Sequence, residues 1–189
     1  MTRAIANANI KAELTANLSN TVEGATQAGT KPSIQAGRGY KYSASDIASG
    51  TLANQADRIW HSISRALTSG SSETIDVYDL GSLDIGAGAG RDGLGQLWTV
   101  AEIVGILIRS ATTSAGNLII GGEGSGAAWN SLFNGSDTAQ LLLPPGGLFL
   151  MASPADPAWA VTDVTNHLLK LAASGGAVTY DITLLGRSA

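Results

Sequence analysis

Apolar and polar residues alternate along several short segments of this chain, a pattern typical of half-buried β-strands. Residues 10–18 (IKAELTANL) give the clearest case, because every even position is apolar and every odd position is polar. In a helix these apolar residues would be spread around the whole circumference. Residues 177–185 alternate in the same way. Both segments are therefore predicted to be strands with one buried face.

Further segments of this kind follow one another between turn residues from residue 39 onward. We predict body strands at 39–45, 58–67, 73–79, 98–109, 117–121, 140–143, 147–152, 158–161, 166–173 and 177–185. The last two are expected to form a hairpin across Ser174, Gly175 and Gly176. Residues 99–108 could instead form one short helix, but their Val and Ile content favours a strand.

Glycine and proline mark the turns between these segments. The chain has 24 glycines in 189 residues, well above the average usage of roughly 7%. Pro144, Pro145, Gly146 and Gly147 predict a tight turn. Long amphipathic helical segments, which βαβ units would need, are missing. The sequence therefore predicts an all-β fold, a sandwich or a barrel, of about eight to ten strands.

The first part of the chain differs from the rest. Residues 23–39 are rich in Gly, Thr, Gln, Lys and Pro, which indicates an extended linker. We therefore divide the chain into an N-terminal arm and linker (1–38) and a β-sandwich body (39–189). Ile10, Leu14 and Leu18 are predicted to face a partner or a neighbouring subunit, by adding a strand to an open sheet edge. The alternative is that this strand completes the protein's own sandwich.

The low content of charged residues suggests a protein that works in contact with others. Only 14% of the residues are charged and the formal net charge is −4, whereas soluble domains average roughly 25% charged residues. Lys and Glu are depleted at the buried parts of protein interfaces. The alternative is a plain Ser/Thr-rich β-domain. Because Lys and Arg are scattered singly, nucleic acid is not expected as a partner.

The cysteine content and the apolar runs of the sequence indicate in which compartment the protein works and whether it attaches to a membrane. The chain has no cysteine, which excludes disulfides and thiolate metal sites. The longest apolar run, residues 103–108, is too short to span a bilayer. The first residues lack the continuous apolar stretch of a signal peptide. We expect a soluble protein, made in the cytoplasm, with no membrane partner.

Two glycine-rich segments resemble phosphate-binding loops. Gly88, Gly90 and Gly93 fit the G-x-G-x-x-G pattern of dinucleotide sites. However, the following segment is β-branched, and no acidic residue stands about 20 positions further on to bind a ribose. Residues 121–126 (GGEGSG) lack the Lys-Ser/Thr ending of a P-loop. Both segments are predicted to be loops, and no nucleotide cofactor is expected.

The remaining candidates for chemistry are histidines, aspartates and tryptophans. His61 and His167 have no further histidine or carboxylate at the spacing of metal ligands. An alternative calcium loop would use Asp76, Asp79, Asp84 and Asp92, although the Asp-x-Asp-x-Asp-Gly register is missing. Trp60, Trp98, Trp129 and Trp159 could form a sugar-binding platform, but with ten aromatic residues the core is expected to need most of them. We predict no catalytic, cofactor-binding or metal-binding residue.

Four segments of the body resemble a recurring pattern in virion proteins of tailed bacteriophages. These segments are residues 48–60 (ASGTLANQADRIW), 72–80 (SETIDVYDL), 143–150 (LPPGGLFL) and 178–186 (VTYDITLLG). They are similar to small β-sandwich proteins of phage particles, including capsid decoration (cement) proteins. The resemblance covers about residues 45 to 189 and leaves out the arm. It consists of turns and strand endings and includes no active-site signature.

This resemblance implies a fold, a partner and a location. It implies a jelly-roll-like β-sandwich that forms a homotrimer, binds the major capsid protein and lies on the outer surface of the phage head. Such a structural protein stabilises the shell by non-covalent contacts and is not an enzyme. Two alternatives stay open: a tail or neck component of a phage, and a glycan-binding β-sandwich module.

Overall fold

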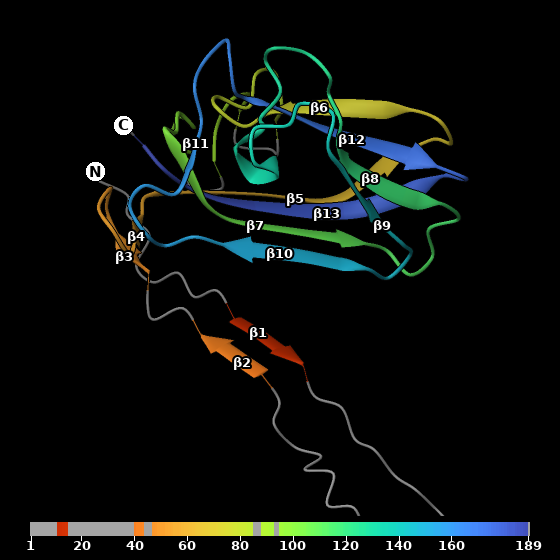
Figure 1. Cartoon of the computed structure of the whole chain (residues 1–189), viewed down its shortest axis with the longest axis horizontal. Helices are drawn as coiled ribbons and strands as arrows, with labels where there is room; N and C mark the ends of the chain where they lie inside the picture. Colours follow the sequence, from red (N-terminus) through yellow and green to blue (C-terminus); the bar gives the residue numbers. More distant parts are fainter. Residues whose placement is uncertain (1–10, 15–39, 44–46, 85–87, 93–94, 189) are drawn as a thin grey trace, which may run out of the picture.

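Two antiparallel β-sheets, packed face to face, make up most of the structure (Figure 1). The computed structural model describes residues 11–14, 40–43, 47–84, 88–92 and 95–188. Within these ranges the only helical segment is a 3₁₀ turn at Ser131–Phe133, and no helix is long and apolar enough to cross a membrane. The predicted all-β fold is therefore confirmed.

The first sheet, named here the β7–β13 sheet, has five strands. Its order is β10-β7-β13-β5, and β11 pairs with β7 beyond the end of β10. Every pairing in it is antiparallel. Its strands are β5 (Arg58–Leu67), β7 (Glu102–Ser110), β10 (Leu148–Ala152), β11 (Trp159–Ala160) and β13 (Val178–Arg187).

The second sheet, named the β8–β12 sheet, has four strands in the order β6-β12-β8-β9. It is also antiparallel throughout. Its strands are β6 (Ser72–Asp76), β8 (Asn117–Gly121), β9 (Gln140–Leu143) and β12 (Leu168–Ser174).

The core lies between the two sheets and is built by strand alternation. Along β12, Leu169, Leu171 and Ala173 are buried while the residues between them are partly exposed. Burying side chains on one face of each strand removes a continuous apolar layer from water. The largest buried side chains of this layer are Trp60, Trp98, Trp129, Tyr180, Ile75, Leu80, Ile103, Ile106, Ile108 and Leu118.

The strand pairings follow a simple rule along the chain. The strands β5, β6, β7 and β8 pair in turn with β13, β12, β10 and β9. Early strands thus pair with late strands in reverse order, as in the two arms of a long hairpin. Pairing of β7 with β13 joins two of these strand pairs into one sheet, and pairing of β8 with β12 joins the other two into the second sheet.

Most predicted strands from residue 58 onward are found, with shifted ends. The segment left open between strand and helix is strand β7, although it begins at Glu102 and not at Trp98. The predicted turn after residue 143 is also found, with the Gly147 N–H donating to the Pro144 carbonyl at 2.8 Å. This turn connects β9 in one sheet with β10 in the other.

The predicted hairpin between the last two strands is wrong. Strand β12 pairs with β6 and β8, whereas β13 pairs with β5 and β7, so the two lie in different sheets. Both sides of each strand are already occupied. The turn at Gly175 and Gly176 therefore passes from one sheet to the other. Alternation shows which face of a strand is buried, but it does not show to which sheet the strand belongs.

A β-bulge interrupts β5 opposite Asp181. The register pairs Tyr180 with Arg65 and Ile182 with Ser62, so Ile63 and Ser64 together oppose one residue of β13. Ser64 has a φ of 55°, and its N–H donates to Asp181 Oδ1 at 2.9 Å. Because the extra residue reverses the alternation, Arg65 lies on the inner side of the sheet.

Two small ladders precede the sandwich. Strand β1 (Lys11–Leu14) pairs antiparallel with β2 (Tyr40–Ser43), and this ladder forms a separate two-stranded sheet. The short strands β3 (Ala48–Ser49) and β4 (Gln55–Ala56) pair in parallel. The partner found for β1 is thus β2, which we had placed in the body. The division after residue 38 stays a prediction.

Candidate interaction surface

The aspartates considered for calcium binding act as acceptors in turns. Asp76 Oδ1 accepts the N–H groups of Tyr78 at 2.9 Å and Asp79 at 3.3 Å, and Asp79 Oδ1 accepts the Gly81 N–H at 2.7 Å. Burial raises the pKa of Asp76, an effect that these N–H groups oppose. Across the described ranges, no group of three His, Asp or Glu side chains could hold a metal ion. The carboxylates stabilise the connection after β6.

The two histidines lie on different sheets. His61 belongs to β5 and its Nδ1 is 2.7 Å from the Thr183 hydroxyl. His167 precedes β12, and its Nε2 is 3.6 Å from Asp76 Oδ2. Each histidine thus interacts with a neighbouring strand of its own sheet. Within the described chain these contacts bring together no Ser-His-Asp arrangement.

The glycine segment around residue 90 forms a tight loop. The Trp98 N–H donates to the Gly90 carbonyl at 2.9 Å, and the Gly90 N–H donates to the Leu83 carbonyl at 3.0 Å. Gly90 has a φ of +65°, and a Cβ there would lie 3.2 Å from the Asp79 carbonyl oxygen. Strand β7 follows this loop, whereas a dinucleotide site requires a helix. Gly93 lies outside the described residues.

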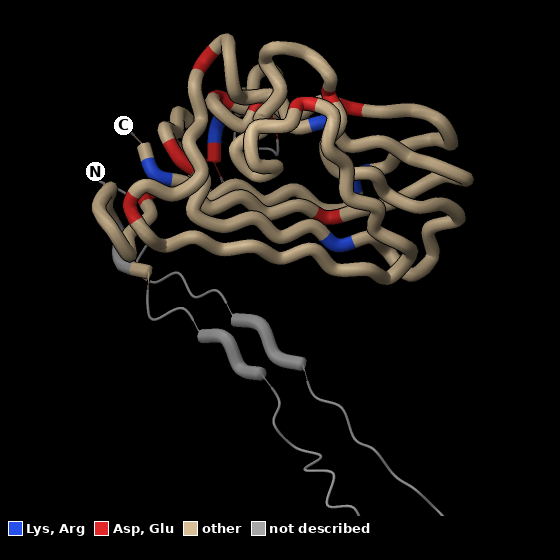
Figure 2. Tube along the Cα trace, viewed as in Figure 1, with Lys and Arg blue, Asp and Glu red and all other residues tan. Residues whose placement is uncertain are grey.

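Most arginines of the described sandwich are paired with carboxylates of the same chain. Figure 2 shows where the charged residues lie along the chain. Within the described residues, ion pairs join Arg58 to Asp57, Arg65 to Glu73, Arg109 to Asp181 and Arg187 to Glu102. A phosphate backbone needs cationic side chains that are free to contact it. In these four arginines the guanidinium group already pairs with a carboxylate of the same chain.

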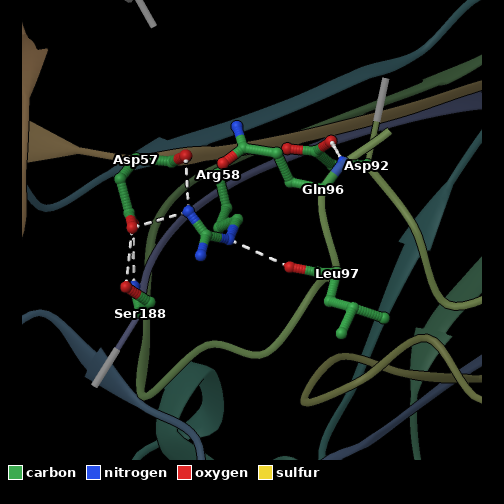
Figure 3. A network of polar contacts seen from close by, with 6 residues as sticks. All are labelled: Asp57, Arg58, Asp92, Gln96, Leu97 and Ser188. Atoms are coloured by element: carbon green, nitrogen blue, oxygen red, sulfur yellow. Dashed lines mark hydrogen bonds and ion pairs between the residues drawn. The ribbon is translucent and has the colours of Figure 1, made fainter. Parts of the chain in front are cut away.

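One of these networks closes an end of the sandwich (Figure 3). Arg58 donates from Nη1 to Asp57 Oδ2 at 2.7 Å and from Nε to the Leu97 carbonyl at 3.0 Å. The Ser188 N–H and hydroxyl both donate to the Asp57 carboxylate, at 2.8 and 2.6 Å. The start of β5, the end of β13 and the loop before β7 are thus held together. The network therefore stabilises this end of the fold.

A second network connects the two sheets. Arg65 pairs with Glu73 of β6, and the Tyr180 hydroxyl donates to Glu73 Oε1 at 2.5 Å. Arg65 Nε also contacts the Tyr180 hydroxyl oxygen at 3.2 Å. The β5 bulge makes this arrangement possible, since it places Arg65 on the inner side.

Alkaline pH is expected to weaken the fold through Tyr180. Burial, followed by the Glu73 carboxylate, raises the pKa of Tyr180 above its ordinary value of 10.0. Because the folded pKa is the higher one, this contribution is fully present below about pH 10 and declines as the pH rises further. Urea unfolding measured between about pH 8 and 11 should show this decline. Tyr180→Phe should flatten it, and an unchanged pH dependence in that variant would contradict the assignment.

The tryptophans do not form an exposed platform. Trp60, Trp98 and Trp129 are buried, and Trp159 is partly buried against the core. The indole N–H of Trp98 donates to the Val77 carbonyl at 2.9 Å, and that of Trp129 donates to the Ala160 carbonyl at 3.0 Å. The expectation that the core uses most of these rings is confirmed. A sugar-binding face would have to be built without them.

One end of the outer face of the β7–β13 sheet is covered by its own chain. Ile47 and Ala56, from the segment around β3 and β4, pack with Val104 and Leu185 in a second small core. Ile59 and Ala158 pack against this group. This sheet therefore has apolar residues on both faces, and at this end the outer layer is complete.

Among the described residues, no segment packs over the rest of this outer face, and we name it the open surface. Across the sheet the register places Leu150, Leu107, Thr183 and His61 in one row. In the next row Leu148 and Arg109 lie opposite each other, followed by Asp181 and the bulge. Leu148 is 58% exposed and Ile63 is 63% exposed. The open surface comprises His61, Ile63, Leu107, Arg109, Leu148, Leu150, Asp181 and Thr183.

The residues predicted to contact a partner lie in or beside β1. Ile10 and Leu18 fall outside the described residues. Leu14 is the last residue of β1 and pairs with Tyr40 of β2. Their role in binding a partner stays a prediction.

Sequence reasoning missed the open surface, although a signal for it exists. Residues 148–152 (LFLMA) are apolar at every position, so both faces of β10 are apolar. The same is true of residues 103–108 in β7. Continuous apolar strands are typical of sheets covered on both faces. In the part of the chain that the structure describes, the second cover extends over one end of the sheet only.

No model of a known protein family matches this chain, and no curated protein matches it significantly.

Proposed function

We propose that this protein is a structural virion protein, a capsid decoration (cement) protein that binds the outer shell of a tailed-phage head. It stabilises the shell by non-covalent contacts with the major capsid protein and with its own copies, as a homotrimer. The proposal follows the resemblance of residues 45–189 to such proteins.

The observation that carries the proposal is the order of the strands. The sheets β10-β7-β13-β5 and β6-β12-β8-β9, with early strands paired to late ones in reverse, have the order expected for a jelly roll. This architecture is frequent in viral capsid proteins and also occurs in lectins and cupins. Lectin function is less well supported, because three of the four tryptophans are buried. The order supports a virion role by analogy of architecture.

The surface of the sandwich supports an assembly role independently. Four arginines are paired within the chain, and the open surface exposes apolar side chains such as Leu148 and Ile63. Exposed apolar groups next to paired charges are suited to contact with another protein. The main polar clusters of the described chain hold strands and turns in place.

Labelling of particles tests the location. An antibody raised against the purified protein is applied to phage particles from the source culture, and gold-labelled antibody is located by electron microscopy. We expect label over the outer surface of the head. Label on tails or necks would support the alternative component, and unlabelled particles would contradict a virion role.

The purified protein is expected to be a β-rich oligomer, with a trimer preferred. Apolar side chains left on the open surface favour association because burying them removes apolar area from water. Far-ultraviolet circular dichroism and light scattering measure these two properties. A stable monomer at high micromolar concentration would contradict the assembly proposal while leaving the fold intact.

A further inference from the structure

We propose that Asn134 is a site of covalent modification, where the side-chain amide is converted to a carboxylate when the surrounding loop opens. Of the nine asparagines in the chain, only Asn134 is followed by glycine. Asn134 and Gly135 are both exposed and lie in the connection between β8 and β9. This inference concerns the chemistry of the chain itself and does not depend on the proposed function.

The conversion needs no reagent other than water. The backbone nitrogen of Gly135 attacks Cγ of Asn134 and forms a C–N bond, while the side-chain amide leaves as ammonia and takes the proton of the Gly135 N–H. Water then opens the cyclic imide at either of its carbonyls. The product is aspartate with the original backbone, or isoaspartate, in which the backbone runs through the side chain. Glycine favours this attack because it has no side chain to hinder the nitrogen.

The folded backbone prevents the ring from closing. Asn134 follows the 3₁₀ turn Ser131–Phe133 in the left-handed conformation, with φ 53° and ψ 41°, which asparagine adopts more readily than most residues. Ring closure requires the Gly135 nitrogen and the Asn134 Cβ to lie on the same side of the Asn134 Cα–C bond. A ψ of 41° places them on opposite sides. The Gly135 N–H is also engaged, because it donates to the Asn130 carbonyl at 3.0 Å.

Further hydrogen bonds hold this loop closed. The Phe133 N–H donates to the same Asn130 carbonyl at 2.8 Å, and the Ser136 N–H donates to the Phe133 carbonyl at 3.2 Å. The Asn130 side chain donates from Nδ2 to Asp137 Oδ1 at 2.7 Å and so joins the two ends of the loop. Each hydrogen bond of this kind favours the closed loop by roughly twofold to tenfold. The reaction should therefore take place in the minority of molecules whose loop is open.

Modification should keep the loop from closing again. Isoaspartate adds one methylene to the backbone, so the Gly135 N–H no longer reaches the Asn130 carbonyl in the same turn. Phe133 of this turn is partly buried and packs against the core. Its ring lies close to the end of β8, since a Cβ on Gly121 would lie 2.7 Å from Phe133 Cζ. The conversion thus loosens the packing at this end of β8 and makes a transient opening irreversible.

Peptide mapping of the full-length protein tests the proposal. Native protein and protein unfolded in urea are incubated at mildly alkaline pH and digested, and mass spectrometry measures the conversion of amide to acid at each asparagine. We expect conversion at Asn134 to be at least about tenfold slower in the native protein than in urea. Equal rates at Asn134 in the two samples would overturn the proposal.

Asn54 is the internal control for the role of glycine. It is also exposed and left-handed, with a φ of 59°, but it is followed by Gln55. In urea, where the fold no longer matters, Asn54 should react several-fold more slowly than Asn134 because the Gln55 side chain hinders the attacking nitrogen. Equal rates at the two asparagines in urea would also overturn the proposal.

Variants of the loop test whether its closure controls the reaction. Asn130→Ala and Asp137→Ala each remove one end of the hydrogen bond between these side chains. Each should accelerate conversion of the native protein several-fold and leave the rate in urea nearly unchanged. Thr138→Ala changes an exposed neighbour and is the matched control, which should keep the native rate. Circular dichroism checks that each variant is folded. Folded loop variants that convert at the native rate, or an equal acceleration in Thr138→Ala, would overturn the control by loop closure.

Discussion

Replacing Arg187 with alanine is expected to reduce the free energy of unfolding by about 3–5 kcal/mol, the usual effect of breaking a buried ion pair. The Arg187 side chain is 2% exposed and pairs with Glu102 at 2.5 Å. It also donates to the carbonyls of Leu52 at 2.9 Å and Ala155 at 2.5 Å. Its removal leaves a carboxylate and two carbonyls without their donor.

The same substitution should also loosen the cover of the second small core. Leu52 belongs to the segment that carries Ile47 and Ala56, and Arg187 anchors this segment to the end of β13. Without that anchor the covered end of the outer face should become accessible. Proteolysis within residues 47–56 should be faster in Arg187→Ala than in the native protein.

Arg109→Ala is the matched control. Arg109 pairs with Asp181 at 2.8 Å, but its side chain is 62% exposed. Exposed pairs of this kind contribute about 0–1 kcal/mol. Urea unfolding followed by tryptophan fluorescence measures both variants. Equal losses of unfolding free energy in the two variants would show that the burial of Arg187 does not determine the size of its contribution.

Gly116→Ala is expected to destabilise the protein by about 3 kcal/mol, the upper range for overpacking a filled interior. A Cβ at residue 116 would lie 2.5 Å from the backbone N and O of Gly176 and 2.6 Å from the Ser174 carbonyl oxygen. These atoms belong to the turn that carries the chain from β12 to β13. No rotamer can relieve a clash between a Cβ and backbone atoms, so the turn itself must move.

Two other glycines provide a graded comparison. Gly126 has open space around its Cβ position and no positive φ, so Gly126→Ala should change stability by less than about 0.5 kcal/mol. Gly175 also has open space but a φ of +77°, so Gly175→Ala should cost about 1 kcal/mol through backbone strain. In a protein of this size, each kcal/mol of lost unfolding free energy should lower the Tm by roughly 2–4 °C. Thermal unfolding of each variant measures this change. A small change in the Tm of Gly116→Ala would show that the segment before β8 is not in close contact with the turn between β12 and β13.

The sequence by itself determined the class of fold and the location of most strands. Alternation along residues 177–185 correctly indicated one buried face, because strand periodicity depends only on local geometry. Val178, Tyr180, Ile182 and Leu184 are all buried. The Pro144 and Gly147 turn was also predicted, since its residues restrict the backbone directly. The small number of aromatic residues correctly suggested that the core takes up most of the tryptophans.

Only the tertiary structure decided which strands are neighbours and which faces remain open. Strands β12 and β13 follow each other along the chain but lie in different sheets, because the pairing of a strand depends on partners far away in sequence. The bulge at Ser64 turned Arg65 toward Glu73, and a one-residue shift of this kind leaves no clear trace in an alternating pattern. Likewise, β10 is apolar at every position, so its sequence does not show which of its two faces is covered. Packing of the whole chain covers one end of this sheet with Ile47 and leaves Leu148 exposed.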